Sequence, residues 1–371
     1  VTHGLSKHYK DRKSVIFIAD GGSTDDTREV AKEFQIKPWQ EKVVAIYRGP
    51  GGKGTAMRSI FESANRLKIK ACAVVDSDLR SITPDWVKYL LDPVLEKGFQ
   101  FVAPVYVRHK YDGTITNNIV YNLTRALYGQ RIRQPIGGDF ALSRDIIKFY
   151  IEQDVWETDV ARFGIDIWLT TNAITNGFRT CQSNLGVKIH DAKDPGMHLG
   201  PMFRQVLWTV FTLMEQNEVF WKKVGRSEAV ETFGFRGALE PEAVDVNLEG
   251  MIENFKIGYQ QFSVLWKDII SEECFEAVKK ASRMKPETFH LPTEAWVRIL
   301  YELAATFHTW SSNRNKLIDL MTPLYYCRVA SFVGQTRDMS SQEAEALVEE
   351  QANKFEEDKD YLIRIWDRGA K

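Results

Sequence analysis

Cysteine is scarce in this sequence, and the few cysteines lie far apart. The chain of 371 residues has four of them, Cys72, Cys181, Cys274 and Cys327, and no two form a CxxC pair. This usage excludes the disulfide framework of a small secreted protein. We therefore expect free thiols and a cytoplasmic location.

Long apolar runs and an excess of one charge are also missing. No segment approaches the roughly 18 consecutive apolar residues that a membrane helix needs, and no signal peptide is visible, so we expect no stable membrane insertion. The 49 basic and 50 acidic side chains nearly cancel. No global field therefore attracts nucleic acid or an anionic membrane, and an anionic partner must be recognised at a local site.

The apolar residues that are present, 44% of the chain, suffice for two domains. Up to residue 200, strand-like runs alternate with helical patterns. This rhythm predicts an α/β domain with a doubly wound, mostly parallel sheet over residues 1–200. From 201 to 371 apolar residues recur at spacings of three and four, which predicts a helical C-terminal domain. Ser340 and Glu343 have the spacing of a helix capping box, and residues 225–245 are expected to be irregular.

Polar or glycine-rich segments follow three strands of the predicted sheet. Asp20 ends the strand-like run 14–20, the glycine-rich loop 49–54 follows the next run, and Asp76 and Asp78 follow the run 71–75. Ligands of doubly wound sheets bind at the carboxyl ends of the strands. We therefore expect these residues to share one edge of the sheet.

The motif Asp76-Ser77-Asp78 ends an apolar run in two carboxylates. Side chains two positions apart on a strand point to the same face, so both carboxylates could project together. One could meet a ribose hydroxyl while the other binds Mg²⁺ or Mn²⁺, which prefer oxygen ligands and keep substrate phosphates in their shell. The alternative is a solvated strand end that binds nothing.

Two glycine-containing loops admit both a ligand and an ordinary turn. Asp20 precedes two glycines and a polar helix start, which suits a uridine-type nucleotide or simple helix capping. The segment RGPGGKGT places Lys53 at a helix start, where lysine and backbone N–H groups suit a diphosphate. It lacks the Ser or Thr of a Walker motif, and the alternative is a flexible glycine turn.

Three further segments carry candidate residues. Gly137 and Gly138, followed by Asp139, allow close backbone approach to a ligand. Asp166 lies in an apolar context where a carboxylate needs a polar partner. His190 follows a strand-like run and could be a neutral metal ligand, although the alternative is a structural histidine.

These motifs occur in a recognisable order: DGGSTDDT, GGKG, DSD, QPIGGD, FGID and NLGVKIH. From about residue 15 to 210 the chain resembles the retaining GT-A glycosyltransferases that make glucosyl- and mannosyl-glycerates, such as mannosylglycerate synthase and glucosyl-3-phosphoglycerate synthase. The resemblance implies a GT-A-like sheet. It also implies that the first strand of the family is missing from this chain, so that the uridine pocket is incomplete.

The resemblance also implies roles for individual residues. Asp78 and His190 would be the protein ligands of the divalent metal. Asp20, Lys53, Asp76 and Ser77 would contact the donor nucleotide or its diphosphate. Arg108, Thr116, Gly137 and Gly138 would contact the acceptor. Ile136 would lend a backbone carbonyl near the anomeric carbon, and Asp166 would orient or deprotonate the acceptor hydroxyl.

Some positions depart from the family pattern. The family more often has glutamate where Asp139 stands, and the phosphoglycerate enzymes have it more often where Asp166 stands. Aspartate keeps the charge but shortens its reach. After His190 the phosphoglycerate enzymes have Arg and Asn, whereas this chain has Asp191 and Ala192. These residues argue against a phosphorylated acceptor, although Lys193 could substitute.

The resemblance therefore implies transfer of a hexose, with retention, from a UDP- or GDP-hexose to a glycerate-like acid. Trp and Phe faces in the C-terminal helices also suggest a homodimer. Two alternatives stay open, namely a sugar nucleotidyltransferase and a non-catalytic protein that binds a nucleotide sugar or a partner.

Overall fold

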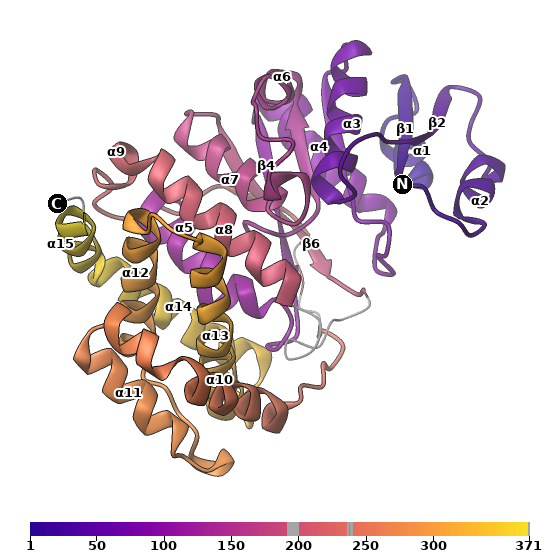
Figure 1. Ribbon diagram of the computed structural model, residues 1–371. Helices are drawn as coiled ribbons and strands as arrows, with labels where there is room; N and C mark the ends of the chain where they lie inside the picture. The colour runs from indigo at the N-terminus through magenta and orange to yellow at the C-terminus, as the bar shows by residue number, and fades with distance from the viewer. Residues whose placement is uncertain (191–199, 236, 238–239, 370–371) are drawn as a thin grey trace. The chain divides into compact units, whose positions relative to one another are not determined.

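The structure, a computed structural model, describes residues 1–190, 200–235, 237 and 240–369 (Figure 1). By their internal contacts these residues form two compact units. The sheet unit comprises Val1–Val107, Ile132–Asp191 and Val230–Pro241, and the helical unit comprises Arg108–Arg131, Ala192–Ala229 and Glu242–Lys371. The sequence predicts a single domain boundary after residue 200, whereas each of these units combines three segments of the chain. The predicted boundary stays a prediction.

The sheet unit contains two groups of hydrogen-bonded strands. The first is the parallel pair β1 (Ser14–Asp20) and β2 (Gln40–Ile46). The second has five strands in the order β3-β5-β4-β6-β7, with the bounds Ala71–Val74 for β3, Phe101–Val107 for β4, Phe140–Ser143 for β5, Thr180–Val187 for β6 and Thr232–Gly234 for β7. Among the described residues no strand joins β1 to β3. The absence of the first strand of the family stays a prediction.

The pairings are mostly parallel, as predicted, and β5 is the antiparallel strand of the sheet unit. Strand β5 runs antiparallel to both β3 and β4, whereas β4 pairs in parallel with β6, and β6 with β7. Strand β7 also lies within the segment 225–245 that was expected to be irregular. Strand β7 has only three residues paired with β6. A strand this short shows no alternating hydrophobic pattern in the sequence.

Strand β3 ends at Val74, before the two aspartates of the DSD motif. Val74 is paired with Phe140 of β5. The residue before Phe140, Asp139, accepts a hydrogen bond from the Asp76 N–H through its side chain at 2.7 Å instead of continuing the ladder. Asp76 is half-buried and Asp78 is exposed in the following turn. The two carboxylates therefore do not project from a strand end into one environment, contrary to the prediction.

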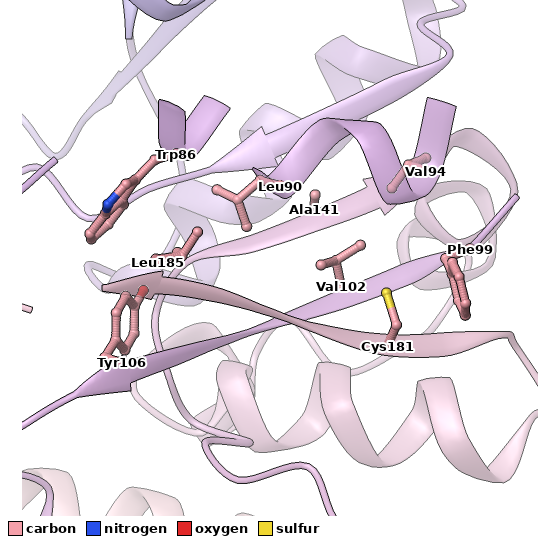
Figure 2. Packing of buried hydrophobic residues seen from close by; sticks show 9 residues of the cluster. All are labelled: Trp86, Leu90, Val94, Phe99, Val102, Tyr106, Ala141, Cys181 and Leu185. Atoms are coloured by element: carbon pink, nitrogen blue, oxygen red, sulfur yellow. The ribbon is translucent and has the colours of Figure 1, made fainter. Parts of the chain in front are cut away.

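Helix α4 (Pro84–Lys97) packs on one face of the five-stranded sheet. Its Trp86, Leu90 and Val94 are buried against β4, β5 and β6, as Figure 2 shows, on Val102, Tyr106, Ala141, Cys181 and Leu185. Burial of each large apolar side chain contributes about 1.5–3 kcal/mol. The rings of Trp86 and Tyr106 lie 5.5 Å apart, so this core also fixes the position of Tyr106.

The other helices of the sheet unit are α1 (Thr2–His8), α2 (Thr27–Glu33), α3 (Lys53–Arg66), α6 (Arg144–Ile151) and α7 (Ile165–Thr175), with a short 3-10 turn at Asp159–Ala161. Helix α3 begins at Lys53, directly after the glycine-rich loop, and α7 begins one residue before Asp166. The two helix starts thus carry two of the predicted site residues.

The helical unit confirms the predicted helical pattern of the C-terminal part. Its α-helices are α5 (Tyr121–Tyr128), α8 (Gly200–Gln216), α9 (Glu218–Trp221), α10 (Leu248–Ile269), α11 (Glu272–Ser282), α12 (Thr293–Thr309), α13 (Arg314–Thr336), α14 (Ser341–Glu357) and α15 (Lys359–Gly369). A π-helical turn spans Thr116–Val120, and a 3-10 turn spans Pro286–Thr288. The predicted capping box is present, since Ser340 and Glu343 bond each other's backbone N–H groups.

The four cysteines are free thiols, as predicted. Burial raises the pKa of Cys72 to about 12, and that of Cys274 to about 12 as well. Both thiols are therefore protonated and unreactive at neutral pH. In the part of the chain that the structure describes, every helix is too short or too polar to span a bilayer.

Candidate active site

Asp20 closes strand β1 and organises the turn that follows it. One carboxylate oxygen accepts hydrogen bonds from the N–H groups of Gly22 and Ser23 at 2.8 and 2.9 Å, and the other accepts the Ser23 hydroxyl at 2.5 Å. The Ser23 hydroxyl and these backbone donors lower the pKa of Asp20. Much of this carboxylate is therefore engaged in shaping its own loop.

The glycine-rich loop directs Lys53 into the sheet unit. Gly54 must be glycine, because a Cβ atom there would lie 1.8 Å from the Val160 carbonyl oxygen. The Lys53 ammonium lies 2.9 Å from Asp76 Oδ1 and 3.2 Å from Asp166 Oδ2. Three residues predicted from separate motifs are thus in direct contact.

Lys188 is a second lysine in this cluster, and the sequence analysis did not select it. Its ammonium lies 3.2 Å from Asp76 Oδ2 and 3.2 Å from Asp139 Oδ2, and it donates to the Gly137 carbonyl at 2.9 Å. Its side chain is only 4% exposed. Like the DSD motif, it directly follows a buried strand, and this signal could have identified it.

Asp139 is the buried anchor of the cluster. It is fully buried and binds the Asp76 N–H, the Lys188 ammonium and the Tyr106 hydroxyl. Each of its oxygens thus has a donor, as a buried carboxylate requires. Asp139 thereby fixes the backbone of Asp76.

Gly138 lies against the carboxylate of Asp76. Its φ of +91° is in the region that favours glycine, and a Cβ atom there would lie 2.2 Å from Asp76 Oδ2. A Cβ atom at Gly137 would lie 2.2 Å from the Pro104 ring. The half-buried Ile136 is in the preceding turn. Gly138 therefore lets the QPIGGD loop pass close to Asp76, whereas the predicted approach of the two glycines to a ligand stays a prediction.

Charges alternate through the cluster in the order Asp139, Lys188, Asp76, Lys53 and Asp166. Burial by itself would raise the pKa of Asp76, but the two lysines hold it well below its usual range. Burial raises the pKa of Asp166 against the opposing charge of Lys53. Burial by itself would lower the pKa of Lys53, but the charges of Asp166 and Asp76 outweigh burial and raise this pKa. Asp76 is thus a permanent anion, whereas Asp166 holds a proton more readily.

Asp166 has one oxygen available for a further partner. Oδ2 contacts Lys53, but Oδ1 is buried and has no hydrogen-bond partner among the described residues. A buried acceptor without a donor is unfavourable by about 1–3 kcal/mol. The free oxygen is therefore suited to a donor from a ligand, such as a hydroxyl group.

The two predicted metal ligands lie on adjoining segments. The Arg80 N–H donates to the Ile189 carbonyl at 2.9 Å, and the Ile189 N–H donates to the Ser81 hydroxyl at 2.9 Å. These bonds tie the turn after Ser77 and Asp78 to the segment that ends in His190. Among the described residues no group of three or more His, Cys, Asp or Glu side chains could hold a metal ion.

The predicted acceptor contacts Arg108 and Thr116 belong to the helical unit. The Arg108 guanidinium lies 3.7 Å from Asp112 Oδ2, and Thr116 is buried at the start of the π-helical turn. They thus belong to a different unit from the cluster around Asp76. Asp191, Ala192 and Lys193, which bear on a phosphorylated acceptor, lie outside the described residues.

A family comparison covers the first part of this site. Residues 3–151 match the model of glycosyl transferase family 2. This match confirms the resemblance to GT-A glycosyltransferases for this part of the chain. The matched range contains Asp20, Lys53, Asp76, Gly138 and Asp139, whereas Asp166, Lys188 and His190 lie beyond it.

A search of solved structures gave partial matches. Glucosyl-3-phosphoglycerate synthase from Mycobacterium tuberculosis, in complex with phosphoglyceric acid, is 21% identical over 57% of this chain and 84% of that chain, with a TM-score of 0.43. Mannosyl-3-phosphoglycerate synthase from Rubrobacter xylanophilus is 21% identical over 55% of this chain and 64% of that chain, with a TM-score of 0.40. A search of curated proteins gave no match.

Proposed function

On the premise that residues 3–151 match glycosyl transferase family 2, we propose that the chain is a hexosyltransferase that forms a glycosylglycerate-like product. The donor is a UDP- or GDP-hexose, with glucose or mannose as the sugar. The acceptor is a small glycerate-like acid, and transfer occurs with retention at the anomeric carbon. The protein acts in the cytoplasm.

The contact of Lys53 with both Asp76 and Asp166 carries this proposal. Lys53 neutralises the charge that develops on the departing diphosphate, and Asp20, Asp76 and Ser77 bind the nucleotide part. Asp166 accepts a hydrogen bond from the acceptor hydroxyl at its unpartnered oxygen, Oδ1. Its raised pKa suits a group that orients this hydroxyl or takes its proton.

Asp78 and His190 are proposed to hold Mg²⁺ or Mn²⁺. An exposed carboxylate and an imidazole on an adjoining segment fit such a cation, and two protein ligands leave positions for phosphate oxygens and water. The cation, when bound, supplies positive charge to the diphosphate.

The acceptor is proposed to be recognised by its carboxylate. Arg108 offers a guanidinium fork that suits a carboxylate, and Thr116 adds a hydroxyl. The backbone of Gly137 and Gly138 is proposed to contact the acceptor, and the Ile136 carbonyl to lie near the anomeric carbon. Holding the acceptor in this way lowers the activation free energy, because the reacting groups are already positioned before the reaction.

The test is incubation of the protein with UDP- and GDP-hexoses, Mn²⁺, and glycerate, phosphoglycerate or lactate. We expect release of a nucleoside diphosphate and an α-linked product by NMR. Release of pyrophosphate would instead identify a nucleotidyltransferase. If the donors bind with Mn²⁺ but no product forms, and Asp78→Ala leaves binding unchanged, the protein is a non-catalytic binding module.

A homodimer remains part of the proposal, but the reason given for it changes. The Trp and Phe side chains of the described helical unit are buried or half-buried, so they form no exposed face. Exposed apolar residues on α10, namely Ile257, Val264 and Leu265, offer a surface for a second copy. Analytical ultracentrifugation of the wild type and of Val264→Asp would test this.

A further inference from the structure

Arg328 is a buried cation in the helical unit, far in sequence from the motifs discussed above. It lies on α13 and is only 2% exposed. Helix α13 contacts α8, α10 and α12, and most of its side chains are buried. The guanidinium is therefore enclosed by protein and is not solvated as a surface arginine would be.

Few of the hydrogen-bond donors of Arg328 have partners. Its Nε donates to the Asn118 side-chain oxygen at 3.1 Å. Its Nη1 is buried and has no hydrogen-bond partner among the described residues. No carboxylate of the described chain lies within ion-pair distance of it, and Glu294, which acts on it through space, is exposed.

Arg125 shows how the same unit treats another buried arginine. Its side chain is 4% exposed. It binds the carboxylates of Glu349 and Glu356 and the side-chain oxygen of Asn353. The charge of Arg125 is thus compensated by the protein itself, whereas that of Arg328 is not. The comparison indicates that something outside the chain completes the surroundings of Arg328.

The nearest titratable side chains do not compensate the charge of Arg328, because the lowered pKa of His290 keeps it neutral at neutral pH and Glu294 is exposed. His290 lies 3.3 Å from the hydroxyl of Ser331, which is one helical turn from Arg328. Burial, Arg328 and Lys280 lower the pKa of His290, which places these two cations close to it. Burial lowers the pKa of Arg328 to about 10, so the guanidinium is still charged at neutral pH. A buried charge of this kind needs a counter-charge.

We propose that the Nη1 edge of Arg328 binds a small inorganic anion of the size of chloride. A spherical anion needs only a few N–H or O–H donors and no fixed direction. The guanidinium supplies both the charge and, at the buried Nη1, the N–H donors that lack a partner among the described residues. The site is independent of the proposed transferase reaction.

The first test compares thermal unfolding of the whole chain in sodium chloride and in sodium gluconate at equal ionic strength. At a chloride concentration well above the dissociation constant we expect an unfolding midpoint about 2–8 °C higher than in gluconate. Arg328→Met removes the cation and is expected to abolish this difference. Arg125→Met is the matched control, because it lowers stability but should keep the full chloride effect.

The second measurement needs no variant, which matters if Arg328→Met does not fold. Binding broadens the chloride-35 NMR signal of the wild type, and added bromide, which competes for the same site, should reverse the broadening. A bromide soak should place one anomalous peak beside Nη1. An equal midpoint in both salts with an unbroadened signal would overturn the proposal. A chloride effect that persists in folded Arg328→Met would also overturn it.

Discussion

Lys188 is the residue that holds the candidate site together, although it was not selected from the sequence. It binds Asp76, Asp139 and the Gly137 carbonyl. In Lys188→Met, the buried Asp139 carboxylate loses the lysine that lies 3.2 Å from its Oδ2. Loss of one member of a buried pair destabilises a protein by about 3–5 kcal/mol. Urea unfolding should report a loss of this size.

A double variant separates the structural role of Lys188 from its role in the site. In Lys188→Met/Asp139→Asn neither buried charge is left alone, so we expect most of the stability to return. Asp76 still lacks one of its two lysines, and we expect turnover to stay about 100-fold below the wild type. If stability and turnover recovered together, Lys188 would have only a structural role.

Asp166 gives a pH-dependent prediction with a defined sign. Its pKa is raised in the fold, so ionisation costs stability there. This loss develops as the pH rises from the ordinary pKa of an aspartate through the raised value. Asp166→Asn lacks the titration, and we expect it to be more stable than the wild type above this window and similar to it at lower pH.

The same substitution tests the chemistry proposed for Asp166. Asparagine cannot take a proton, so we expect turnover to fall by about 100-fold or more. Wild-type turnover should rise with pH as Asp166 ionises. Asp166→Glu keeps the charge and is the control. Wild-type turnover in Asp166→Asn would exclude Asp166 as the base, whatever its effect on stability.

The contacts of single residues could be predicted only where a strand ends in a conspicuous motif. Asp76, Lys53 and Asp166 were predicted from separate motifs and lie together. Lys188 was missed because a single lysine forms no motif. Its position directly after the buried strand β6 was the one signal that could have identified it. The unpartnered oxygen of Asp166 depends on packing among distant segments, and no local pattern encodes it.

At the scale of elements, the QPIGGD loop packs closely against the turn after β3, and substitutions can test this contact. Gly138→Ala forces a side chain into φ of +91° and against Asp76 Oδ2. Gly177 also has a positive φ, +72°, but a Cβ atom there would meet no other atom within 4 Å. Both alanine variants should lose about 1–2 kcal/mol in urea unfolding because of the backbone conformation.

Only Gly138→Ala should also impair the site, since its methyl group displaces Asp76 from Lys53 and Lys188. We expect weaker donor binding in isothermal titration for this variant and wild-type binding for Gly177→Ala. Equal donor binding by the two variants would mean that the close approach at Gly138 does not matter for the donor.

The sequence predicted which elements form more reliably than how they pair. Hydrophobic periodicity is local, and it predicted β1, α3, α4 and the helices of the C-terminal part. The antiparallel direction of β5 was missed, because pairing depends on long-range contacts. The early end of β3 was missed for a similar reason, since the side chain of Asp139 replaces a ladder bond there.

At the scale of the whole molecule, the balance of charge predicts how donor binding responds to salt and to chelators. The 49 basic and 50 acidic side chains leave a formal net charge of −1, so no overall field attracts an anionic donor. Within the cluster, three aspartates face two lysines, which adds no excess of positive charge. Binding of a nucleotide diphosphate sugar should therefore depend on the cation proposed at Asp78 and His190.

Isothermal titration of a UDP- or GDP-hexose tests this expectation. With Mn²⁺ present, raising sodium gluconate should change the affinity by only a few fold, because a single local site is involved. Adding a chelator, or replacing Asp78 by asparagine, should weaken binding by about 100-fold or more, since the diphosphate then meets the carboxylates without a cation between them. Strong salt dependence combined with indifference to the chelator would show that lysines alone hold the donor.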